Sequence, residues 1–412
     1  MSSKGKSSAK TGGGTALVPK LRFPEFQGAD GWKEISLQKL ARPVTDRATT
    51  GDADNVLSLS GEHGLVLQSD YFGKKIAGDS TDRYLKIRKD DFVYNDRTTK
   101  ASSFGTIKRL SNYSGGIVSP IYKCFRFQPS ENPVFWEWYF DSGSHDLALG
   151  GLVNEGARAG RFNISVSQFL STNAWRPDED EQQKIADCLD SVDALIAAQG
   201  RKVEVLRAYK KGLMQQLFPQ EGETQPRLRF PEFEGAGEWE EHKMGDVCEL
   251  YQPVTLSSSE LTMTGEHLVY GANGVIGTHN EYNHADSEVA VTCRGATCGE
   301  VTRTRPMSWI TGNAMVVRPR SGGLEKDFLF QYFKNHGLKS VISGSAQPQI
   351  TRAGFSPLPV SFPAPAEQQR IADCLTALDD LIATETRKLD TLKTHKKGLM
   401  QQLFPHVGDP DA

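Results

Sequence analysis

A stretch of 39 residues occurs twice in this chain of 412 residues, and it limits what the chain can fold into. Residues 181–219 are EQQKIADCLDSVDALIAAQGRKVEVLRAYKKGLMQQLFP, and residues 367–405 are EQQRIADCLTALDDLIATETRKLDTLKTHKKGLMQQLFP. The two copies align without a gap, and most differences between them are conservative. An internal copy this close indicates that one structural unit is used twice.

Each copy is predicted to form one long helix. Apolar residues recur every three and four positions, which places them in a narrow stripe along one side of a helix. Acidic residues at 178–181 favour a helix start, and Pro219 and Pro405 favour the ends of the two helices. Because neither stripe can stay exposed to water, we expect the two helices to pack on each other. The stripes are Ile185, Cys188, Leu189, Val192, Leu195, Ile196, Val203, Leu206 and Leu213, and Ile371, Cys374, Leu375, Leu378, Leu381, Ile382, Leu389, Leu392 and Leu399.

A second repeat, LRFPEF, precedes each of two unlike regions, at residues 21–26 and 228–233. The order along the chain is therefore motif, unlike region, helix, and then the same again. Each unlike region has the usual size of one domain. We predict a disordered tail (1–19), a first recognition domain (20–177), a first spacer helix (178–219), a second recognition domain (220–366), a second spacer helix (367–405) and a short tail (406–412).

The two unlike regions share a coarse pattern of short β-branched or aromatic runs broken by Gly, Asn and Asp. This pattern predicts compact mixed α/β (α+β) domains that are rich in strands. Aromatic runs at 134–140 and 326–333 are predicted to form short helices that close each domain, and 163–170 matches 349–356. Arg97 matches Arg294, Gly105 matches Gly299, and Tyr71 matches Tyr282. The first region is about 21 residues longer, so the matching is only approximate.

The net charge of −3 gives no global sign of a nucleic-acid or membrane partner. No apolar run is long enough to span a membrane. Six widely spread cysteines favour a reduced, cytoplasmic protein. Cys293 and Cys298 lack the spacing and the nearby partners of a usual zinc site.

Local charge is more informative. Residues 97–130 contain six basic residues and no acidic one, and residues 289–324 contain five basic residues against Glu300 alone. Windows at matched positions are typical of a surface that contacts phosphates and bases, although a solvated strand surface is an equal alternative. Arg and Asn are the side chains best shaped to pair with guanine and adenine. The candidate DNA contacts are Arg97, Lys100, Lys108, Arg109, Asn273, Arg294 and Arg303.

Motifs for catalysis are weak. No Walker loop is present, so no segment is expected to bind ATP phosphates. Residues 132–135 resemble the NPP[FY] loop of amino-methyltransferases but lack its second proline. Glu241 and Lys243 have the ExK form of a nuclease site, which arises easily by chance. We predict that the chain is not an enzyme.

With its two EQQ[KR]IADCL and KKGLMQQLFP blocks and its LRFPEF motifs, the chain closely resembles the specificity (S) subunits of type I restriction–modification systems. The resemblance covers nearly the whole chain. It implies that each variable domain recognises one half of a split DNA site. It also implies that the helices form an antiparallel coiled coil that sets the gap and docks two methyltransferase (M) subunits. The residues expected to form that coil and docking surface are Ile185, Leu189, Val192, Ile196, Leu206, Ile371, Leu375, Leu378, Ile382 and Leu392.

The resemblance also implies partners and a division of labour. The M subunits are expected to bind S-adenosylmethionine, and restriction (R) subunits to use ATP and Mg, so no cofactor or metal is expected on this chain. The expected partners are double-stranded DNA, two M subunits and R subunits. The alternative is an interaction scaffold that binds two proteins on a coiled-coil spacer and does not bind DNA.

Overall fold

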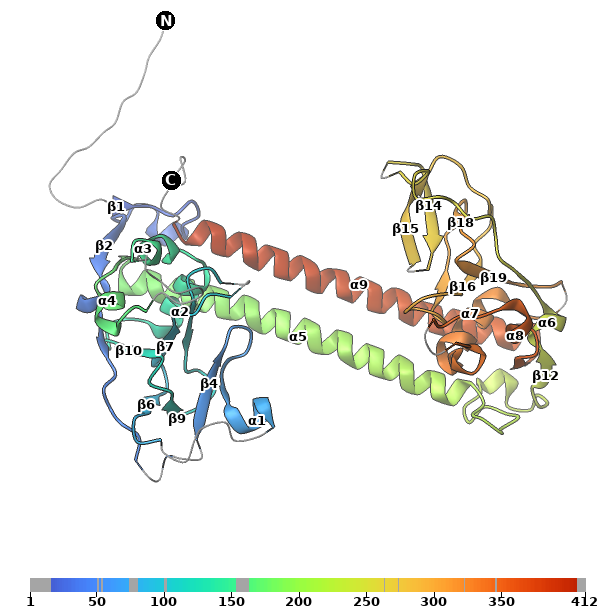
Figure 1. The fold of residues 1–412 in the computed structure, drawn as a ribbon, viewed down its shortest axis with the longest axis horizontal. Coiled ribbons are helices and arrows are strands. Elements are labelled where there is room, and N and C mark those ends of the chain that lie inside the picture. The colour runs from blue at the N-terminus through green and yellow to red at the C-terminus, as the bar shows by residue number, and fades with distance from the viewer. Residues whose placement is uncertain are drawn as a thin grey trace, which may run out of the picture. The chain divides into compact units, whose positions relative to one another are not determined.

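The computed structural model describes residues 16–49, 52, 55–73, 81–99, 102–152, 163–262, 264–272, 274–321, 323–344 and 347–405. The chain divides into two compact units, one built from Met1–Ala198 with Leu389–Ala412 and the other from Gln199–Lys388. Each unit combines small β-sheets with parts of two long helices, α5 (Glu179–Leu217) and α9 (Pro365–Leu403) (Figure 1). The predicted mixed α/β fold class is confirmed.

The two long helices pack together within each unit. In the first unit Leu189, near the start of α5, shares a core with Leu403, at the end of α9. In the second unit Leu217, at the end of α5, shares a core with Ile371, near the start of α9. The helices are therefore antiparallel, and the predicted coiled coil of two long helices is confirmed.

An ion pair that recurs in each unit links the two helices. Asp193 pairs with Lys396 at 2.5 Å in the first unit, and Lys210 pairs with Asp379 at 2.6 Å in the second. Asp193 and Asp379 occupy equivalent positions in the two copies, and so do Lys210 and Lys396. The repeated sequence therefore makes the same contact in each unit.

The seam between the helices differs from the predicted stripe at one position in each copy. Leu195 is 53% exposed and Leu381 is 40% exposed. The side of an α-helix that faces a partner shifts slowly along a seven-residue repeat, so a stripe defined by spacing alone is wider than the contact. Of the ten residues predicted to form the coil and docking surface, four are buried (Ile185, Leu189, Ile371, Leu375) and six are half-buried (Val192, Ile196, Leu206, Leu378, Ile382, Leu392).

The described residues of the first unit form three sheets. The first is β1 (Ala16–Leu17), β2 (Trp32–Ser36) and β11 (Asn173–Arg176). The second is β3 (Ala41–Pro43), β10 (Lys123–Phe127), β7 (Phe92–Asn95) and β8 (Thr106–Arg109). The third is β5 (Gly64–Leu67), β4 (Val56–Ser60), β9 (Gly115–Val118) and β6 (Leu85–Arg88).

The second unit has three corresponding sheets. They are β12 (Glu240–Lys243) with β20 (Pro359–Phe362); β13 (Cys248–Tyr251), β19 (Ala314–Pro319), β16 (Val289–Thr292) and β17 (Val301–Arg303); and β15 (Gly274–His279), β14 (His267–Gly271) and β18 (Trp309–Ile310). A parallel pair occurs in the same place in both units, β4 with β9 and β14 with β18. The extra length of the first domain contains α1 (Gln68–Phe72) and β6.

Short helices complete each domain as the aromatic runs predicted. The closing helices are α2 (Pro133–Asp141) and α7 (Lys326–His336). Asn132, in the segment that resembled a methyltransferase loop, caps α2 by accepting hydrogen bonds from the amides of Val134 and Phe135. The remaining short helices are η1 (Pro24–Phe26), η2 (Leu37–Lys39), α3 (Asp146–Gly150), α4 (Val166–Leu170), η4 (Pro231–Phe233), α6 (Met244–Val247), η5 (Lys339–Val341) and α8 (Arg352–Phe355).

Aromatic side chains from α2 and α7 form the domain cores. In the first unit Trp136 stacks on Phe127 of β10 with ring centroids 4.7 Å apart. In the second, Phe328 packs against Trp239 at 5.6 Å. Such pairs favour a fixed ring geometry as well as burial. In the described part of the chain no helix has the length and apolar character needed to cross a membrane.

Candidate nucleic-acid interface

Two hairpins occupy the same position in the two domains. In the first, β7 pairs with β8 so that Asn95 lies opposite Thr106. In the second, β16 pairs with β17 so that Val291 lies opposite Val301. Each hairpin forms the end of a four-stranded sheet of equivalent strand order. The hairpin loops are therefore equivalent elements of the two domains.

Arg97 and Arg294 lie at the start of these loops. Each follows its strand by two residues, since β7 ends at Asn95 and β16 ends at Thr292. Both arginine side chains are exposed. Among the described residues, no acidic side chain lies within ion-pairing distance of either guanidinium. The structure thus places these two candidates alike, as exposed side chains at the start of equivalent loops.

A glycine ends each loop in a backbone conformation that other residues avoid. Gly105 has a φ of 86° and Gly299 a φ of 92°. The match between Gly105 and Gly299, made from sequence alone, reflects a shared requirement for left-handed backbone. In the first loop Thr99 and Ser102 also exchange backbone hydrogen bonds of 2.9 and 3.2 Å. Among the described residues, the two loops therefore share the left-handed glycine, and Thr99 with Ser102 link the two sides of the first loop.

The strand-borne candidates of the first domain are engaged by acidic side chains. Lys108 donates to Asp141 of α2 at 2.8 Å, and its side chain is 18% exposed. Arg109 pairs with Asp90 at 2.6 Å and with Glu137 of α2 at 2.7 Å. Burial raises the pKa of the Glu137 carboxyl, while the Arg109 guanidinium opposes that rise. These cations hold β8 against the closing helix.

Arg303 of the second domain has the same role. It lies on β17, the equivalent of β8, and donates to Asp327 of α7 at 2.7 Å. Its side chain is 26% exposed, and it also donates to the carbonyl of Ser287 at 2.9 Å. Lys100 and Asn273, the two other candidates, lie outside the described residues. The seven candidates therefore do not form one uniform surface, and the two loop arginines differ from the strand cations.

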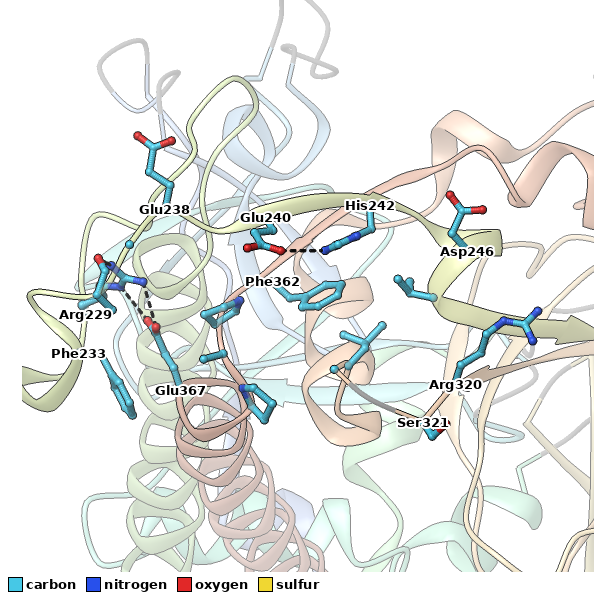
Figure 2. Close-up of a pocket in the computed structure, with 18 residues that line it drawn as sticks. Arg229, Phe233, Glu238, Glu240, His242, Asp246, Arg320, Ser321, Phe362 and Glu367 are labelled. Carbon is cyan, nitrogen blue, oxygen red and sulfur yellow. Dashed lines mark hydrogen bonds and ion pairs between the residues drawn. The ribbon is translucent and has the colours of Figure 1, made fainter.

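A cavity of about 650 Å³ lies in the second unit beside the second LRFPEF motif (Figure 2). Its walls include Arg229, Glu240, His242 and Phe362, and none of the candidate DNA contacts lines it. His242, from the ExK-like stretch, stacks on Phe362 with centroids 4.8 Å apart and faces Glu240 at 3.6 Å. Among the described residues, no group of three or more His, Cys, Asp or Glu side chains is placed to hold a metal ion.

Comparison with known proteins gives a family match in the second half of the chain. Residues 236–394 match the family described as the Type I restriction modification DNA specificity domain. A putative type I restriction enzyme MjaX specificity subunit of Methanocaldococcus jannaschii is 24% identical over 260 residues, 59% of this chain and 60% of that protein. The EcoprrI specificity subunit of Escherichia coli is 30% identical over 112 residues, 27% of this chain and 28% of that protein.

A further relative, the MjaVIII specificity subunit of M. jannaschii, is 26% identical over 190 residues, which are 43% of each chain. The matched part of this chain therefore spans about 60% of the length of the first of these curated relatives and less of the other two.

Solved structures share the fold over nearly the whole length. The S subunit of a type I restriction–modification system from M. genitalium superposes with a TM-score of 0.58 at 14% identity, covering 95% of this chain and 100% of that one. A chain from a structure of type I system assembly and conformational transition gives a TM-score of 0.54 at 17% identity, covering 91% and 97%. The resemblance inferred from the repeats is thus confirmed: residues 236–394 match the model of the type I restriction modification DNA specificity domain, and the chain has the fold of type I specificity (S) subunits.

Proposed function

We propose that this chain is the DNA sequence-specificity subunit of a type I restriction–modification complex, in which each variable domain recognises one half of a bipartite DNA site. The observation that carries the proposal is the pair of exposed arginines, Arg97 and Arg294, in equivalent loops of two otherwise different domains. Arginine pairs bidentately with guanine in the major groove. An exposed arginine at the same place in two domains of different sequence suits the recognition of two different short DNA sequences.

The proposed DNA contacts fall into two ranks. Arg97 and Arg294 are the proposed base contacts, because no carboxylate of the described residues neutralises them. Lys108, Arg109 and Arg303 are phosphate contacts of second rank, because a DNA phosphate has to compete with the carboxylates that already bind them. Lys100 and Asn273 remain proposed contacts on their sequence position alone. Phosphate contacts give affinity, and base contacts give sequence preference.

The antiparallel helices are the proposed spacer and docking surface. Their repeated sequence and repeated ion pairs offer two like surfaces, which suits two copies of one M subunit. The residues predicted to form the coil and docking surface, from Ile185 to Leu206 and from Ile371 to Leu392, are buried or half-buried and are proposed to hold the two helices together. The domain limits 20–177 and 220–366 and the spacer limits 178–219 and 367–405 belong to this proposal.

Chemistry is assigned to the partner subunits. The M subunits bind S-adenosylmethionine and methylate adenine, and the R subunits use ATP and Mg for translocation and cleavage. This chain is non-catalytic and supplies only the choice of site. The proposed location is the cytoplasm, where the DNA and the partner subunits are found.

The direct test is the genome-wide pattern of adenine methylation with the gene intact and with it deleted. Loss of one split motif, with two short half-sites around a fixed gap, is the expected result, and it identifies both half-sites. Methylation that is unchanged in a strain shown to express the chain together with its M subunit contradicts the proposal.

Single substitutions then assign the half-sites to the domains. Arg97→Ala is expected to relax one half-site and Arg294→Ala the other, each by about tenfold in discrimination at one base pair. Arg227→Ala is a matched control, because Arg227 is an exposed arginine whose ion-pair partner among the described residues is nearby Glu223, at 2.8 Å. An equal fall in affinity for all sequences would make the arginine a phosphate contact.

Salt dependence separates this function from the scaffold alternative. DNA binding releases counterions, so the binding constant is expected to fall steeply and linearly with salt on logarithmic axes. A scaffold that binds only proteins has no such dependence on DNA.

A further inference from the structure

A buried ion pair ties the first LRFPEF motif to the start of α5. Arg22 donates from Nε to Glu181 Oε1 at 2.8 Å and from Nη2 to Glu181 Oε2 at 2.7 Å. The two side chains are 6% and 2% exposed. The same guanidinium donates to the carbonyl oxygens of Ala29 and Asp30 at 2.8 and 2.9 Å. A bidentate pair of this kind fixes both distance and orientation.

The second unit repeats this contact. Arg229 donates to the two carboxylate oxygens of Glu367 at 2.8 and 3.0 Å, and Figure 2 shows the pair at one end of the cavity. The side chains are 8% and 2% exposed. Arg229 also donates to the carbonyl of Ala236 at 2.6 Å, as Arg22 does to the equivalent Ala29. Glu181 and Glu367 are each the third residue of their helix.

The next residue of each helix holds the closing helix of the domain. Gln182 Oε1 accepts from the amide of Asn132, the residue before α2, at 3.0 Å. Gln368 Oε1 accepts from the amide of Glu325, the residue before α7, at 2.7 Å. Both glutamines are fully buried. In each unit the glutamate therefore binds the LRFPEF motif at the beginning of the domain, and the glutamine binds the residue before the closing helix. Both contacts join the domain to the start of a long helix.

Stability alone gives a weak reason for keeping these pairs. A buried ion pair costs desolvation, and well-packed apolar side chains often replace it without loss of stability. The two domains have diverged widely, yet the Arg and the Glu-Gln pair recur in both copies with the same contacts. Orientation is the property that a bidentate contact supplies and that an apolar contact does not.

We propose that Glu181 with Gln182, and Glu367 with Gln368, are positioning residues that fix each recognition domain on its spacer helix and so restrict the gap allowed between the two half-sites. The inference rests on the proposed function, because it presumes that both domains bind one DNA duplex. Half-site separation on DNA is a geometric property of how the two recognition elements are held. These residues act through the backbone they hold and have no role in contacting bases.

The test uses the full chain assembled with its M subunits and the double variant Arg22→Met, Glu181→Leu. Duplexes carry both half-sites separated by the native gap or by one base pair more or fewer. The wild-type complex is expected to methylate the native gap with strong preference. In the variant that preference falls about tenfold, since a small misplacement of a bound group has effects of this size or larger. The preference for bases within each half-site stays unchanged.

The matched control removes an exposed pair from the same motif and helix. Glu25 and Lys184 lie 2.9 Å apart and are 45% and 48% exposed, so Glu25→Gln with Lys184→Gln is expected to leave gap preference unchanged. Melting curves establish that each variant is folded. If the first double variant does not fold, Gln182→Met and Gln368→Met test the same idea by removing one acceptor each.

The outcomes separate the two levels of the proposal. A folded variant that keeps the wild-type gap preference overturns the positioning role and leaves the specificity function intact. A wild-type complex that methylates no bipartite site overturns the specificity function, and the positioning role with it. Relaxed base preference at the native gap also overturns the positioning role, because it makes the loss one of recognition.

Discussion

The β7–β8 and β16–β17 hairpin loops are held in equivalent places by different contacts. In the first domain the buried carboxylate of Asp96 accepts from the amide of Ile164 at 3.2 Å and pairs with Lys123 at 2.7 Å. In the second domain the backbone carbonyl of Cys293 accepts from the amide of Ile350 at 2.9 Å. Asp96 and Cys293 both directly precede the loop arginine, and Ile164 matches Ile350.

This difference shows that the contact is kept and that the group making it is not. The link between the loop and the segment before α4 or α8 is kept, although a side chain makes it in one domain and the backbone in the other. A backbone link does not depend on the side chain at that position. The second loop is therefore freer to change its sequence while keeping its shape, and the first loop depends on Asp96.

The largest expected effect comes from breaking the side-chain link. Asp96→Ala leaves Lys123, whose side chain is 16% exposed, without its carboxylate partner and removes the acceptor of the Ile164 amide. We expect a loss of about 3 kcal/mol in the free energy of unfolding, as is usual when one partner of a buried pair is removed. Urea denaturation measures the loss, and hydrogen exchange locates it at the Ile164 amide.

Cys293→Ala is the matched substitution in the second domain. It removes only a buried sulfur, so the cost is expected to be about 1 kcal/mol. The Ile350 amide keeps its backbone acceptor and is expected to exchange as slowly as before. Equal acceleration of the Ile164 and Ile350 amides in their respective variants would contradict the distinction between the two links.

The sequence predicted the repeated parts of the fold well. The long helices follow from apolar spacing, and the positional matches of Arg97 with Arg294 and of Gly105 with Gly299 agree with equivalent hairpins. Both kinds of information are local, because a helix stripe and a left-handed glycine are set by nearby residues. The exposure of Leu195 and Leu381 was missed, since it depends on how two helices meet.

The electrostatic character of the candidate site could not be predicted in the same way. The window from 97 to 130 has no acidic residue, yet acids from outside the window neutralise Lys108, Arg109 and Lys123. These acids come from β-strand ends and from α2, which only the tertiary fold brings close. The Glu181–Arg22 contact was also missed, although the recurrence of both residues with each repeat was a usable signal.

A buried histidine distinguishes the first domain further. His145 is 1% exposed and lies against Phe140 and Phe169. Its Nε2 donates to the hydroxyl of Thr172 at 2.9 Å, because that hydroxyl itself donates to the carbonyl of Phe169. Burial lowers the pKa of His145 to about 3.

This pKa predicts how the first domain responds to acid. Below about pH 6.5 the unfolded chain binds a proton at His145, while the folded domain binds it only near pH 3. The contribution to stability is therefore complete above pH 6.5 and is lost as the pH falls toward 3. The expected loss at pH 5, relative to pH 7, is about 2 kcal/mol.

His145→Phe isolates that contribution from the carboxylates that also titrate in acid. The phenyl ring suits the aromatic surroundings and has no proton to bind, so the variant is expected to have a shallower slope of unfolding free energy against pH. In the second domain His284 has a partner on each ring nitrogen, Tyr251 and Asn283, although burial lowers its pKa too. Parallel slopes for the wild type and His145→Phe would exclude the proposed protonation.

The smallest expected effect concerns the two loop glycines, which share a backbone conformation but not their surroundings. A Cβ at Gly105 would collide with the backbone oxygen of Asn95 and lie 2.9 Å from the ring of Tyr94. A Cβ at Gly299 would lie 3.0 Å from Cδ1 of Ile342, the end of a flexible side chain. Alanine carries the same left-handed strain at both positions, so the difference between them comes from the collision alone.

We therefore expect Gly105→Ala to destabilise the chain by about 1 kcal/mol more than Gly299→Ala, whose cost is limited to the left-handed backbone and a small shift of Ile342. Parallel urea denaturation of the two variants measures the difference.

The same variants connect stability to recognition, because each strained loop carries one proposed base contact. Gly105→Ala is expected to weaken discrimination at the half-site assigned to Arg97, and Gly299→Ala, to a lesser degree, at the half-site assigned to Arg294. A larger cost at Gly299 would mean that the second loop, despite its backbone link, is the more rigid of the two.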